Sequence, residues 1–519
     1  MTSGARAMVW GAFIGIPLGL SNLVVGLKVG LGVGVALTAV GFAAVLRRTP
    51  LFPTLSPQDA AMLQSVASAA GYSAGSATAS VLAASMLAGE MISWPLACAW
   101  TLGVAAFGTA LGWTWHRNAM DLPFPSATAA AASITSTWTT KERPDATAPR
   151  AWILGTLLGL ALTVVKRLAK WLPATALPAG TFGLGIELSP LAFGIGALLG
   201  LRLGLSIAIA GALIALVEGP ALGFDGLGTL AGWNVWPATA LLSAAALTHL
   251  VAGLRLRGAF DQTARRALAW SFVPGAALGA LCVFGFGAPW WAAALAVLTA
   301  PLACVISIRM TGETDVTPGA PLAMGLQLAF GLWAPFSPGV QLASAGVLAG
   351  ASASAADLVS DVKTGTLVGL EPRRQLTAQL VGCVVGALVA GPALILLTQG
   401  KVGTELWPAP AAQMFLATGR AAAGEAVLST GAQWACVVAL LGGIALALIE
   451  RHPRLGKFVP SPMGIGLAML VPPSLGVTIG LGAVVAHALR KKKWVTPAAS
   501  GLMLGETTGE LTAALHDAL

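Results

Sequence analysis

The sequence predicts an all-α, polytopic membrane protein, and three observations lead to this fold class. Of the 519 residues, 56% are hydrophobic and only 9% are charged, and the mean hydropathy is +0.82. A soluble core does not need so much apolar surface, whereas runs of about 20 apolar residues have the length of a helix that crosses a bilayer. The 64 glycines fit helix packing inside a membrane, where small residues let backbones approach closely.

Apolar spans of this length recur along the chain. We expect about 14 to 16 transmembrane helices, and the clearest spans lie near residues 7–25, 29–46, 77–94, 96–115, 151–170, 190–217, 236–254, 268–287, 289–308, 338–356, 375–398, 431–449, 473–489 and 495–515. Shorter apolar pieces rich in Gly, Pro or Ser predict broken or re-entrant segments at 58–75, 123–138, 174–187, 316–335 and 461–472. Such backbone is tolerated at membrane depth only where it is buried in protein or lines a cavity.

The charged and metal-binding residue types exclude several function classes. The net charge is +9, but the cations stand singly or in small groups between apolar spans. This pattern is typical of cytoplasmic loops and does not indicate nucleic-acid binding. The five cysteines lie inside apolar segments without Cys-x-x-Cys spacing, and the five histidines are scattered. No metalloprotease or phosphate-binding loop motif is present. We therefore predict no enzyme, no metal site and no cofactor, with energy supplied by an ion gradient or by no source at all.

Short internal matches favour two pseudo-symmetric halves. Residues 22–30 (NLVVGLKVG) align with residues 357–365 (DLVSDVKTG), which pairs Lys28 with Lys363. Shorter matches follow in the same order, at 194–196 with 464–466 and at 235–238 with 495–498. Many transporters are built from such repeats. We expect an N-terminal transmembrane half at residues 1–260 and a C-terminal transmembrane half at residues 261–519.

The most unusual stretch is 356–365 (ADLVSDVKTG), which places Asp357, Asp361 and Lys363 between apolar segments. A charge at hydrocarbon depth costs roughly 2.5 to 3.5 kcal/mol on insertion scales, so it persists where it faces a partner or a wet cavity. The alternative is an ordinary loop between two helices. We expect the three side chains to form a coupled charge cluster in a central site where broken segments meet.

Other charged residues are candidates for the same chemistry, each with a structural alternative. The stretch 309–318 (RMTGETDVTP) follows an apolar span and could bind a cation or carry a proton, or could be a solvated turn. Glu90 is expected deep in its span as a proton carrier, and Arg202 is expected mid-span, either in an ion pair or facing a substrate carboxylate. The candidates for substrate binding and proton coupling are Asn22, Lys28, Glu90, Arg202, Arg309, Glu313, Asp315, Asp357, Asp361, Lys363 and Glu506.

Six runs of residues resemble the oligopeptide transporter (OPT) superfamily, and most closely its bacterial and yellow-stripe-like branch. They are SNLVVGLKVG (21–30), LPFPSATA (122–129), GIGALLGLRLGLS (194–206), RMTGETDVTP (309–318), ADLVSDVKTGTLVG (356–369) and SGLMLGE (500–506). The motifs stand in family order over nearly the whole chain. Two runs depart from the family pattern: PSAT at 125–128 replaces Pro-Glu-Gly-Thr, and KVGL at 28–31 replaces Lys-Thr-Gly-Trp.

The resemblance implies a secondary transporter that imports oligopeptides, peptide-like solutes or metal chelates across the cytoplasmic (inner) membrane, coupled to protons. Its implied partners are such a solute, protons and the lipid bilayer, and a homo-oligomer is compatible with the sequence. A passive channel for small polar solutes is the alternative from another class, and concentrative uptake would exclude it.

Overall fold

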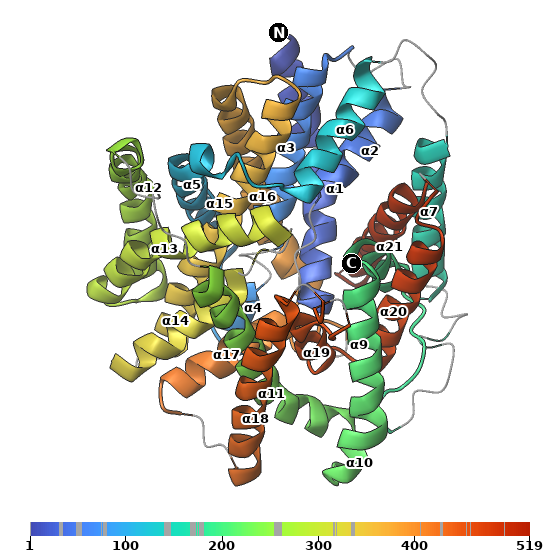
Figure 1. Ribbon diagram of the computed structural model, residues 1–519, viewed down its shortest axis with the longest axis vertical. Helices are drawn as coiled ribbons and strands as arrows, with labels where there is room; N and C mark the ends of the chain where they lie inside the picture. Colours follow the sequence, from blue (N-terminus) through green and yellow to red (C-terminus); the bar gives the residue numbers. More distant parts are fainter. Residues whose placement is uncertain are drawn as a thin grey trace. The chain divides into compact units, whose positions relative to one another are not determined.

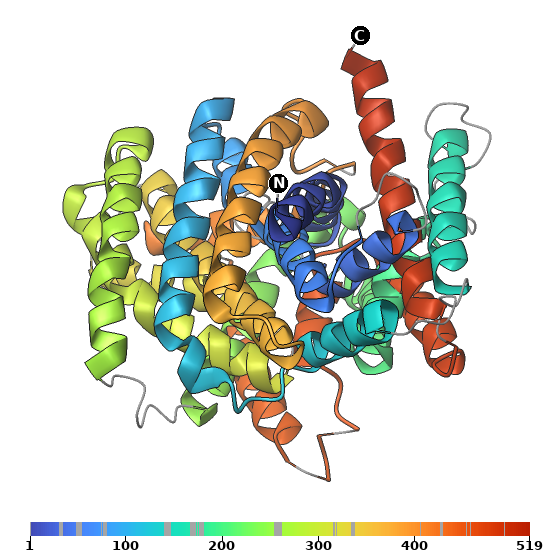
Figure 2. The same ribbon diagram turned by 90° about the horizontal axis from the view of Figure 1, so that it is seen from above.

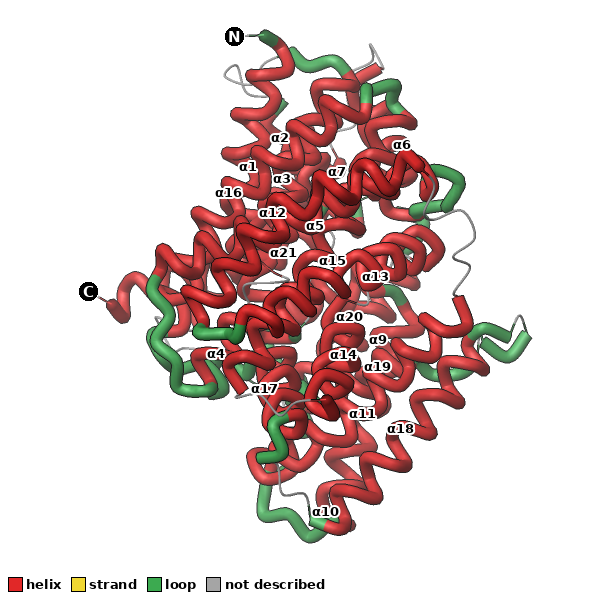
Figure 3. The backbone as a smooth tube through the Cα atoms, turned by 90° about the vertical axis from the view of Figure 1, so that its left-hand side faces the viewer, coloured by secondary structure: helices red, strands yellow, loops and turns green. Residues whose placement is uncertain are grey.

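The computed structural model describes residues 2–518 except for 31–34, 48–53, 74, 76–79, 140–146, 167–172, 174, 176–180, 254–261, 315–316, 318, 334–337, 405, 426–428, 453, 457 and 493. Across these residues the chain is built of helices with two isolated β-bridges and no strand (Figure 1, Figure 3). Eight of the described helices are long and apolar enough to cross a membrane. The predicted all-α, multi-pass membrane fold is confirmed.

Contacts within the chain define two compact units, and each unit is discontinuous in sequence. Unit 1 comprises Met1–Asp145 and Ala252–Glu425, and unit 2 comprises Ala146–Val251 and Ala426–Leu519. Both units therefore draw on both of the halves expected from the sequence. The boundary expected near residue 260 separates two repeated halves of the sequence, whereas these units are defined by contacts. The expected boundary therefore stays a prediction.

Unit 1 contains twelve α-helices and the short 3₁₀ helix η2 (His116–Ala119) among the residues described. The α-helices are α1 (Ser3–Val29), α2 (Ala36–Leu46), α3 (Pro57–Ser73), α4 (Ala83–Leu87), α5 (Trp94–Trp115), α6 (Pro125–Thr139), α12 (Gln262–Phe286), α13 (Trp290–Thr314), α14 (Gly319–Trp333), α15 (Pro338–Leu367), α16 (Pro372–Thr398) and α17 (Pro410–Ala422).

Helix α15 forms the centre of unit 1. Its apolar window is buried throughout, because α3, α5, α6, α13, α14, α16 and α17 all pack against it. Figures 1 and 2 show the dark-blue α1 beside the orange α16, and α3 contacts both of these helices. Small residues allow these close approaches: a Cβ added to Gly112 of α5 would lie 2.7 Å from the Ala355 carbonyl oxygen of α15.

Three expected spans differ from the structure. Residues 338–356 were expected to end before the charged stretch, but α15 continues without a break to Leu367, so the loop interpretation of 356–365 does not hold. The expected span 190–217 is broken at Gly200, whose φ of 82° ends one helix and begins the next. In the expected span 77–94, α4 ends at Leu87, because a turn at Gly89 (φ 88°) reverses the chain.

Unit 2 contains the remaining described helices. These are α7 (Thr147–Val164), α8 (Pro190–Leu199), α9 (Leu201–Leu213), the π-helical turn η4 (Ile214–Glu218), α10 (Gly219–Ala221), α11 (Leu227–Gly253), α18 (Thr430–Glu450), α19 (Pro462–Ala468), α20 (Pro473–Ala488) and α21 (Val495–Ala518). Helix α21 packs against α7 and α8, and α20 packs against α8 and α9.

Glycines at four-residue spacing bring α7 and α21 into backbone contact. Gly155 and Gly159 of α7 face the backbone of α21, while Gly501 and Gly505 of α21 face the backbone of α7. Lipid gives no hydrophobic drive for two helices to associate, so this pair depends on dispersion contacts at short range. A side chain at any of these four positions would collide with backbone of the partner helix.

We predict that Gly505→Val destabilises unit 2 by about 1 to 3 kcal/mol, the usual cost of overpacking. A Cβ at this position would meet the Thr156 carbonyl oxygen and would lie 2.7 Å from the Leu160 nitrogen. The measurement is thermal unfolding of the purified protein in detergent. Gly442→Val is the matched control, since a Cβ at Gly442 meets nothing within 4 Å. Equal unfolding midpoints for the two variants would contradict the prediction.

Candidate functional site

Three helices of unit 1 place polar side chains at four-residue spacing into one buried contact. Residues four apart lie on the same face of a helix, so each helix presents a pair. The pairs, together with one further serine, are Gln64 and Ser68 on α3 with Ser65 beside them, Asp357 and Asp361 on α15, and Gln375 and Gln379 on α16. We call these seven residues the polar layer. Their exposed fractions lie between 0% and 8%, so bulk water cannot satisfy their polar atoms.

The two carboxylates of the polar layer are hydrogen-bonded to different extents. Asp357 accepts from the Ser68 hydroxyl at 3.0 Å on Oδ1 and from Gln379 Nε2 at 2.7 Å on Oδ2. Asp361 accepts from Gln64 Nε2 at 2.7 Å on Oδ1, while its Oδ2 is buried and has no hydrogen-bond partner in the described structure. Each oxygen of Asp357 therefore accepts one hydrogen bond from a neutral donor. Asp361 accepts one on Oδ1, and the Ser65 hydroxyl also interacts with its carboxylate.

Gln375 is fixed between α3 and α15. Its Nε2 donates to the Ser65 hydroxyl, and its Oε1 would lie 2.6 Å from a Cβ built on Gly365. Gly365 stands one turn beyond Asp361 on the same face of α15, so its missing side chain leaves the room that the carboxamide fills. The glycine of the Lys-Thr-Gly run is thus required for packing against Gln375.

A capping box holds the start of α3, the helix that carries Gln64 and Ser68. The Ser56 hydroxyl accepts from the Asp59 backbone nitrogen at 3.1 Å and donates to Asp59 Oδ2 at 2.8 Å. The same oxygen accepts from the Ser3 hydroxyl at 2.6 Å, and Arg374 lies 3.9 Å from Oδ1. Burial raises the pKa of Asp59, but these hydrogen bonds and the Arg374 charge outweigh it and hold the pKa below its ordinary value of 3.8.

The lysine expected to join Asp357 and Asp361 lies elsewhere. Lys363 Nζ donates to the Met120 carbonyl oxygen at 2.6 Å, because position 363 faces away from 357 and 361 on a helix of 3.6 residues per turn. Lys28 is buried at the end of α1, with Nζ 5.9 Å from the Trp407 ring centroid. Asn22 Nδ2 donates to the Gly71 carbonyl oxygen of α3 at 3.0 Å.

Two further candidates of unit 1, Arg309 and Glu90, stand on segments other than the three helices of the polar layer. Arg309 is half-buried on α13, and Glu313 lies in the last turn of the same helix. Asp315 is outside the described residues. Glu90, expected deep in a span, is exposed in the turn between α4 and α5, because α4 ends at Leu87.

In unit 2, Arg202 makes an ion pair. It stands at the start of α9 rather than mid-span, because the helix breaks at Gly200. Its Nη1 donates to Glu450 Oε1 at 2.7 Å and its Nε donates to the Val459 carbonyl oxygen at 2.9 Å. These contacts favour the structural alternative that the sequence left open for this arginine.

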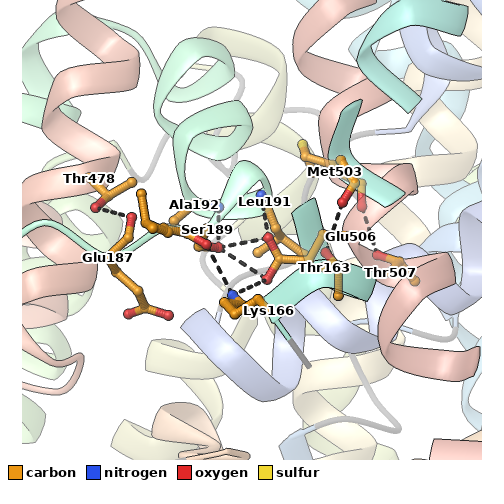
Figure 4. Close-up of polar contacts among 12 residues, drawn as sticks. Thr163, Lys166, Glu187, Ser189, Leu191, Ala192, Thr478, Met503, Glu506 and Thr507 are labelled. Carbon is orange, nitrogen blue, oxygen red and sulfur yellow. Dashed lines mark hydrogen bonds and ion pairs between the residues drawn. The ribbon is translucent and has the colours of Figure 1, made fainter. Parts of the chain in front are cut away.

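Glu506 binds the N-terminus of α8 through its carboxylate (Figure 4). Its Oε2 accepts from the Leu191 backbone N–H at 2.8 Å and from the Ser189 hydroxyl at 2.9 Å. Lys166 Nζ lies 4.0 Å from Oε1 and donates to the Leu188 carbonyl oxygen at 3.0 Å. A helix N-terminus carries partial positive charge and free N–H groups, so a fully buried glutamate is stabilised there.

The acids of both sites stood out in the sequence, but their partners did not. Gln64, Ser65, Ser68, Gln375 and Gln379 were not among the candidates, and neither were Lys166 and Ser189. One usable signal was present: Gln64 and Ser68, like Gln375 and Gln379, repeat the four-residue spacing of Asp357 and Asp361. Neutral amides flanked by alanine and valine carry too little hydropathy signal to attract notice by themselves.

Residues 265–515 match the family model described as OPT oligopeptide transporter protein. This range contains α15, α16 and most of α21, and with them the two aspartates, Gln375, Gln379 and Glu506. Helices α3 and α8, which supply the other sides of the two sites, precede it. The expected family resemblance is confirmed for residues 265–515, and over the rest of the chain it stays a prediction.

Curated relatives match a similar share of the chain. The "Probable metal-nicotianamine transporter YSL17" of Oryza sativa subsp. japonica is 28% identical over 250 residues, 43% of this chain and 35% of the relative. YSL10 of the same plant, with the same description, is 25% identical over 234 residues, 42% and 34%. The "Putative oligopeptide transporter YGL114W" of Saccharomyces cerevisiae is 25% identical over 237 residues, 42% and 32%. The chain thus spans about a third of the length of these relatives, and the bacterial part of the expected branch stays a prediction.

We predict that Asp59→Asn destabilises the protein at neutral pH but not at strongly acidic pH. A carboxylate whose pKa is lowered by folding stabilises the folded state above its unfolded pKa, and this contribution is lost as the pH falls through the folded value. Unfolding midpoints measured from neutral pH to below about pH 4 should therefore converge for wild type and variant. Asp121→Asn, at an exposed position, is the control. A difference that stays constant with pH would contradict the assignment.

We predict that Glu506→Leu costs about 1 to 3 kcal/mol of stability, because it leaves the buried Ser189 hydroxyl and Leu191 N–H without their acceptor. Glu506→Gln retains an acceptor oxygen and should cost less. The measurement is denaturant unfolding of the purified protein in detergent. If both variants lost the same stability, the side chain's shape rather than its hydrogen bonds would account for the effect.

Proposed function

We propose, from the premise that this chain is related to the OPT oligopeptide transporter proteins through residues 265–515, that it is a secondary active transporter. It imports oligopeptides, peptide-like solutes or metal chelates across the cytoplasmic membrane, coupled to protons. The solute classes follow the printed descriptions of its relatives, which name oligopeptides and metal-nicotianamine. The matched family is one of transporters, and we propose transport without a catalytic reaction.

The observation that supports this function best is the pair of acids at the centre of unit 1. Asp357 and Asp361 lie on a helix whose apolar window is wholly buried, and neutral amides and hydroxyls are the partners described for them. Two adjacent buried carboxylates repel each other and are costly to keep ionised. Acids retained at membrane depth are characteristic of proton and substrate pathways.

Asp361 is the proton acceptor in this proposal. Its Oδ2 can take a proton without breaking any hydrogen bond described for it. Protonating Asp357 would weaken the hydrogen bond from Ser68 or Gln379 on whichever oxygen carried the proton. A proton on Asp361 leaves a single negative charge in the polar layer and removes the repulsion between the two acids.

Proton binding drives transport only if the proton prefers one access state of the protein over the other. The polar layer supports such a preference because its hydrogen bonds join α3, α15 and α16. Protonation of Asp361 changes the attraction between these three helices. The proton thereby favours one packing arrangement of the helices over the other. Lys28, buried near Trp407, is the proposed group for a carboxylate of the solute.

The test is uptake by proteoliposomes across a panel of short peptides and metal chelates, with and without an imposed proton gradient. Wild type should concentrate at least one solute when the outside is acidic. Asp361→Asn cannot exchange a proton at this site, so its concentrative uptake should fall to the level of empty vesicles.

The matched control is Glu371→Gln, which removes an exposed carboxylate just before α16 and should leave uptake unchanged. Full proton-driven uptake by a correctly inserted Asp361→Asn would contradict the role of Asp361. Solute flux that ignores the pH gradient and never exceeds equilibrium would identify a passive channel instead.

A further inference from the structure

Helices α3 and α15 of unit 1 run in opposite senses, so the start of α3 lies beside the end of α15. Gln64 Nε2 donates to Asp361 at 2.7 Å. Closer to the start of α3, Gln58 Nε2 donates at 3.2 Å to the carbonyl oxygen of Val368, the residue just after α15. The residue number therefore falls along α3 as it rises along α15.

Helices α1 and α16 start at the same level as α3. Arg374, in the first turn of α16, has its Nη2 3.9 Å from Oδ1 of Asp59, which lies in the first turn of α3. The same Nη2 would lie 2.9 Å from a Cβ built on Gly4, near the start of α1. Three helices that are far apart in the sequence thus begin together.

Helices α5 and α13 end at this level. Lys363 Nζ, one turn before the end of α15, donates at 2.6 Å to the carbonyl oxygen of Met120, which follows α5 and η2. A few residues later, the Phe124 N–H donates at 2.9 Å to the carbonyl oxygen of Gly312, near the end of α13. The starts of α1, α3 and α16 and the ends of α5, α13 and α15 form what we call the first end of unit 1.

The opposite ends of these helices form the second end. The Ala409 N–H, just before α17, donates at 2.7 Å to the carbonyl oxygen of Leu27 near the end of α1. A Cβ on Gly71, near the end of α3, would lie 2.7 Å from a methyl group of Val35, just before α2. Helix α2 therefore starts at the second end and returns the chain to the first end, where α3 begins.

Cations are concentrated at the first end. Among the residues that the structure describes, those on its helix ends are Arg6, Arg47, Arg117, Arg309, Lys363, Arg373 and Arg374. Those at the second end, with α17 included, are Lys28, Lys401 and Arg420. Asp121 and Glu371 also stand at the first end, but acids have little influence on how a membrane protein is oriented.

Exposed tryptophans lie toward both ends and mark two levels of the bilayer. Trp94 and Trp290, at the second end, are 58% and 74% exposed, and Trp270 is 78% exposed. Trp270 lies toward the first end, because α12 runs antiparallel to α5: a Cβ on Gly285, near the end of α12, would lie 2.8 Å from Leu96, near the start of α5. Tryptophans favour both membrane surfaces equally, so the cations decide which surface is which.

We propose that the first end of unit 1 lies at the cytoplasmic surface of the membrane, against the anionic headgroups of that leaflet, and that the second end faces outward. Cations near the ends of membrane spans are retained on the cytoplasmic side, where the surface potential is negative. The orientation places Lys28, the proposed group for a carboxylate of the solute, at the end from which an imported solute arrives. It does not depend on the proposed function, since a chain that moves no solute also has an orientation.

The experiment labels new cysteines in the full chain with a membrane-impermeant maleimide, using spheroplasts before and after lysis. Glu90→Cys and Lys401→Cys, at exposed positions of the second end, should react before lysis. Asp121→Cys and Glu371→Cys, at exposed positions of the first end, should react only after lysis. The wild type is the control for the five native cysteines, which are buried or half-buried.

An epitope tag placed before α1 gives a second measurement that needs no substitution, and an antibody should reach it only after lysis. The inference is overturned if Asp121→Cys or Glu371→Cys reacts before lysis, if Glu90→Cys and Lys401→Cys do not, or if the antibody binds intact spheroplasts. Labelling on the expected sides without any solute uptake would refute the proposed function alone. Proton-driven uptake with the reverse labelling would refute this inference alone.

Discussion

The hydrogen bonds donated to Asp357 and Asp361 are the interaction on which the arrangement of unit 1 depends. A carboxylate in the middle of a buried helix must find donors on its neighbours, and here α3 and α16 supply them through Gln64, Ser68 and Gln379. Those helices can come close enough because glycines and alanines line their contacts with one another. The hydrogen bonds to the two aspartates and the close packing of small residues therefore depend on each other. The bonds need the helices to be close, and the close helices need the bonds to satisfy the buried acids.

Unit 2 meets the same constraint in another way. Its buried acid, Glu506, is held by the N-terminus of α8 and by Ser189, so backbone N–H groups replace the amide side chains of the polar layer. The glycine-lined contact of α21 with α7 and the packing of α21 on α8 set the position of that acid. Both units thus carry a buried acid whose hydrogen bonds depend on the spacing of neighbouring helices.

Much of the fold could be predicted from the sequence, because span length and hydropathy report directly on what a bilayer accepts. Residues 356–365 were also conspicuous in the sequence, since they place three charges in an apolar region. The continuity of α15 was not evident, because a charged run between apolar spans also fits a loop. The break at Gly200 was missed as well, since one glycine among many carries no distinctive signal until its φ is known. Glu90 was placed too deep for the same reason, as the turn that exposes it depends on Gly89.

Of the candidate site, the sequence indicated the two aspartates but not the side chains that donate hydrogen bonds to them. Hydropathy indicates the acids, but it does not indicate that Lys363 points away from them. Nor does it indicate that Gln64 and Gln379 donate to the two aspartates. That information lies in the four-residue spacing within three separate segments and in which of them become neighbours. Because local sequence does not encode the pairing of distant helices, the donors emerged only with the structure.

The burial of α15 has a consequence for how the protein is made. With a hydropathy of 1.4, this helix is among the least apolar of the eight that could cross a membrane, and it carries two aspartates and a lysine. Alone in lipid it would expose those charges. We therefore expect its entry into the bilayer to depend on neighbouring helices that supply hydrogen-bond donors, α3 among them.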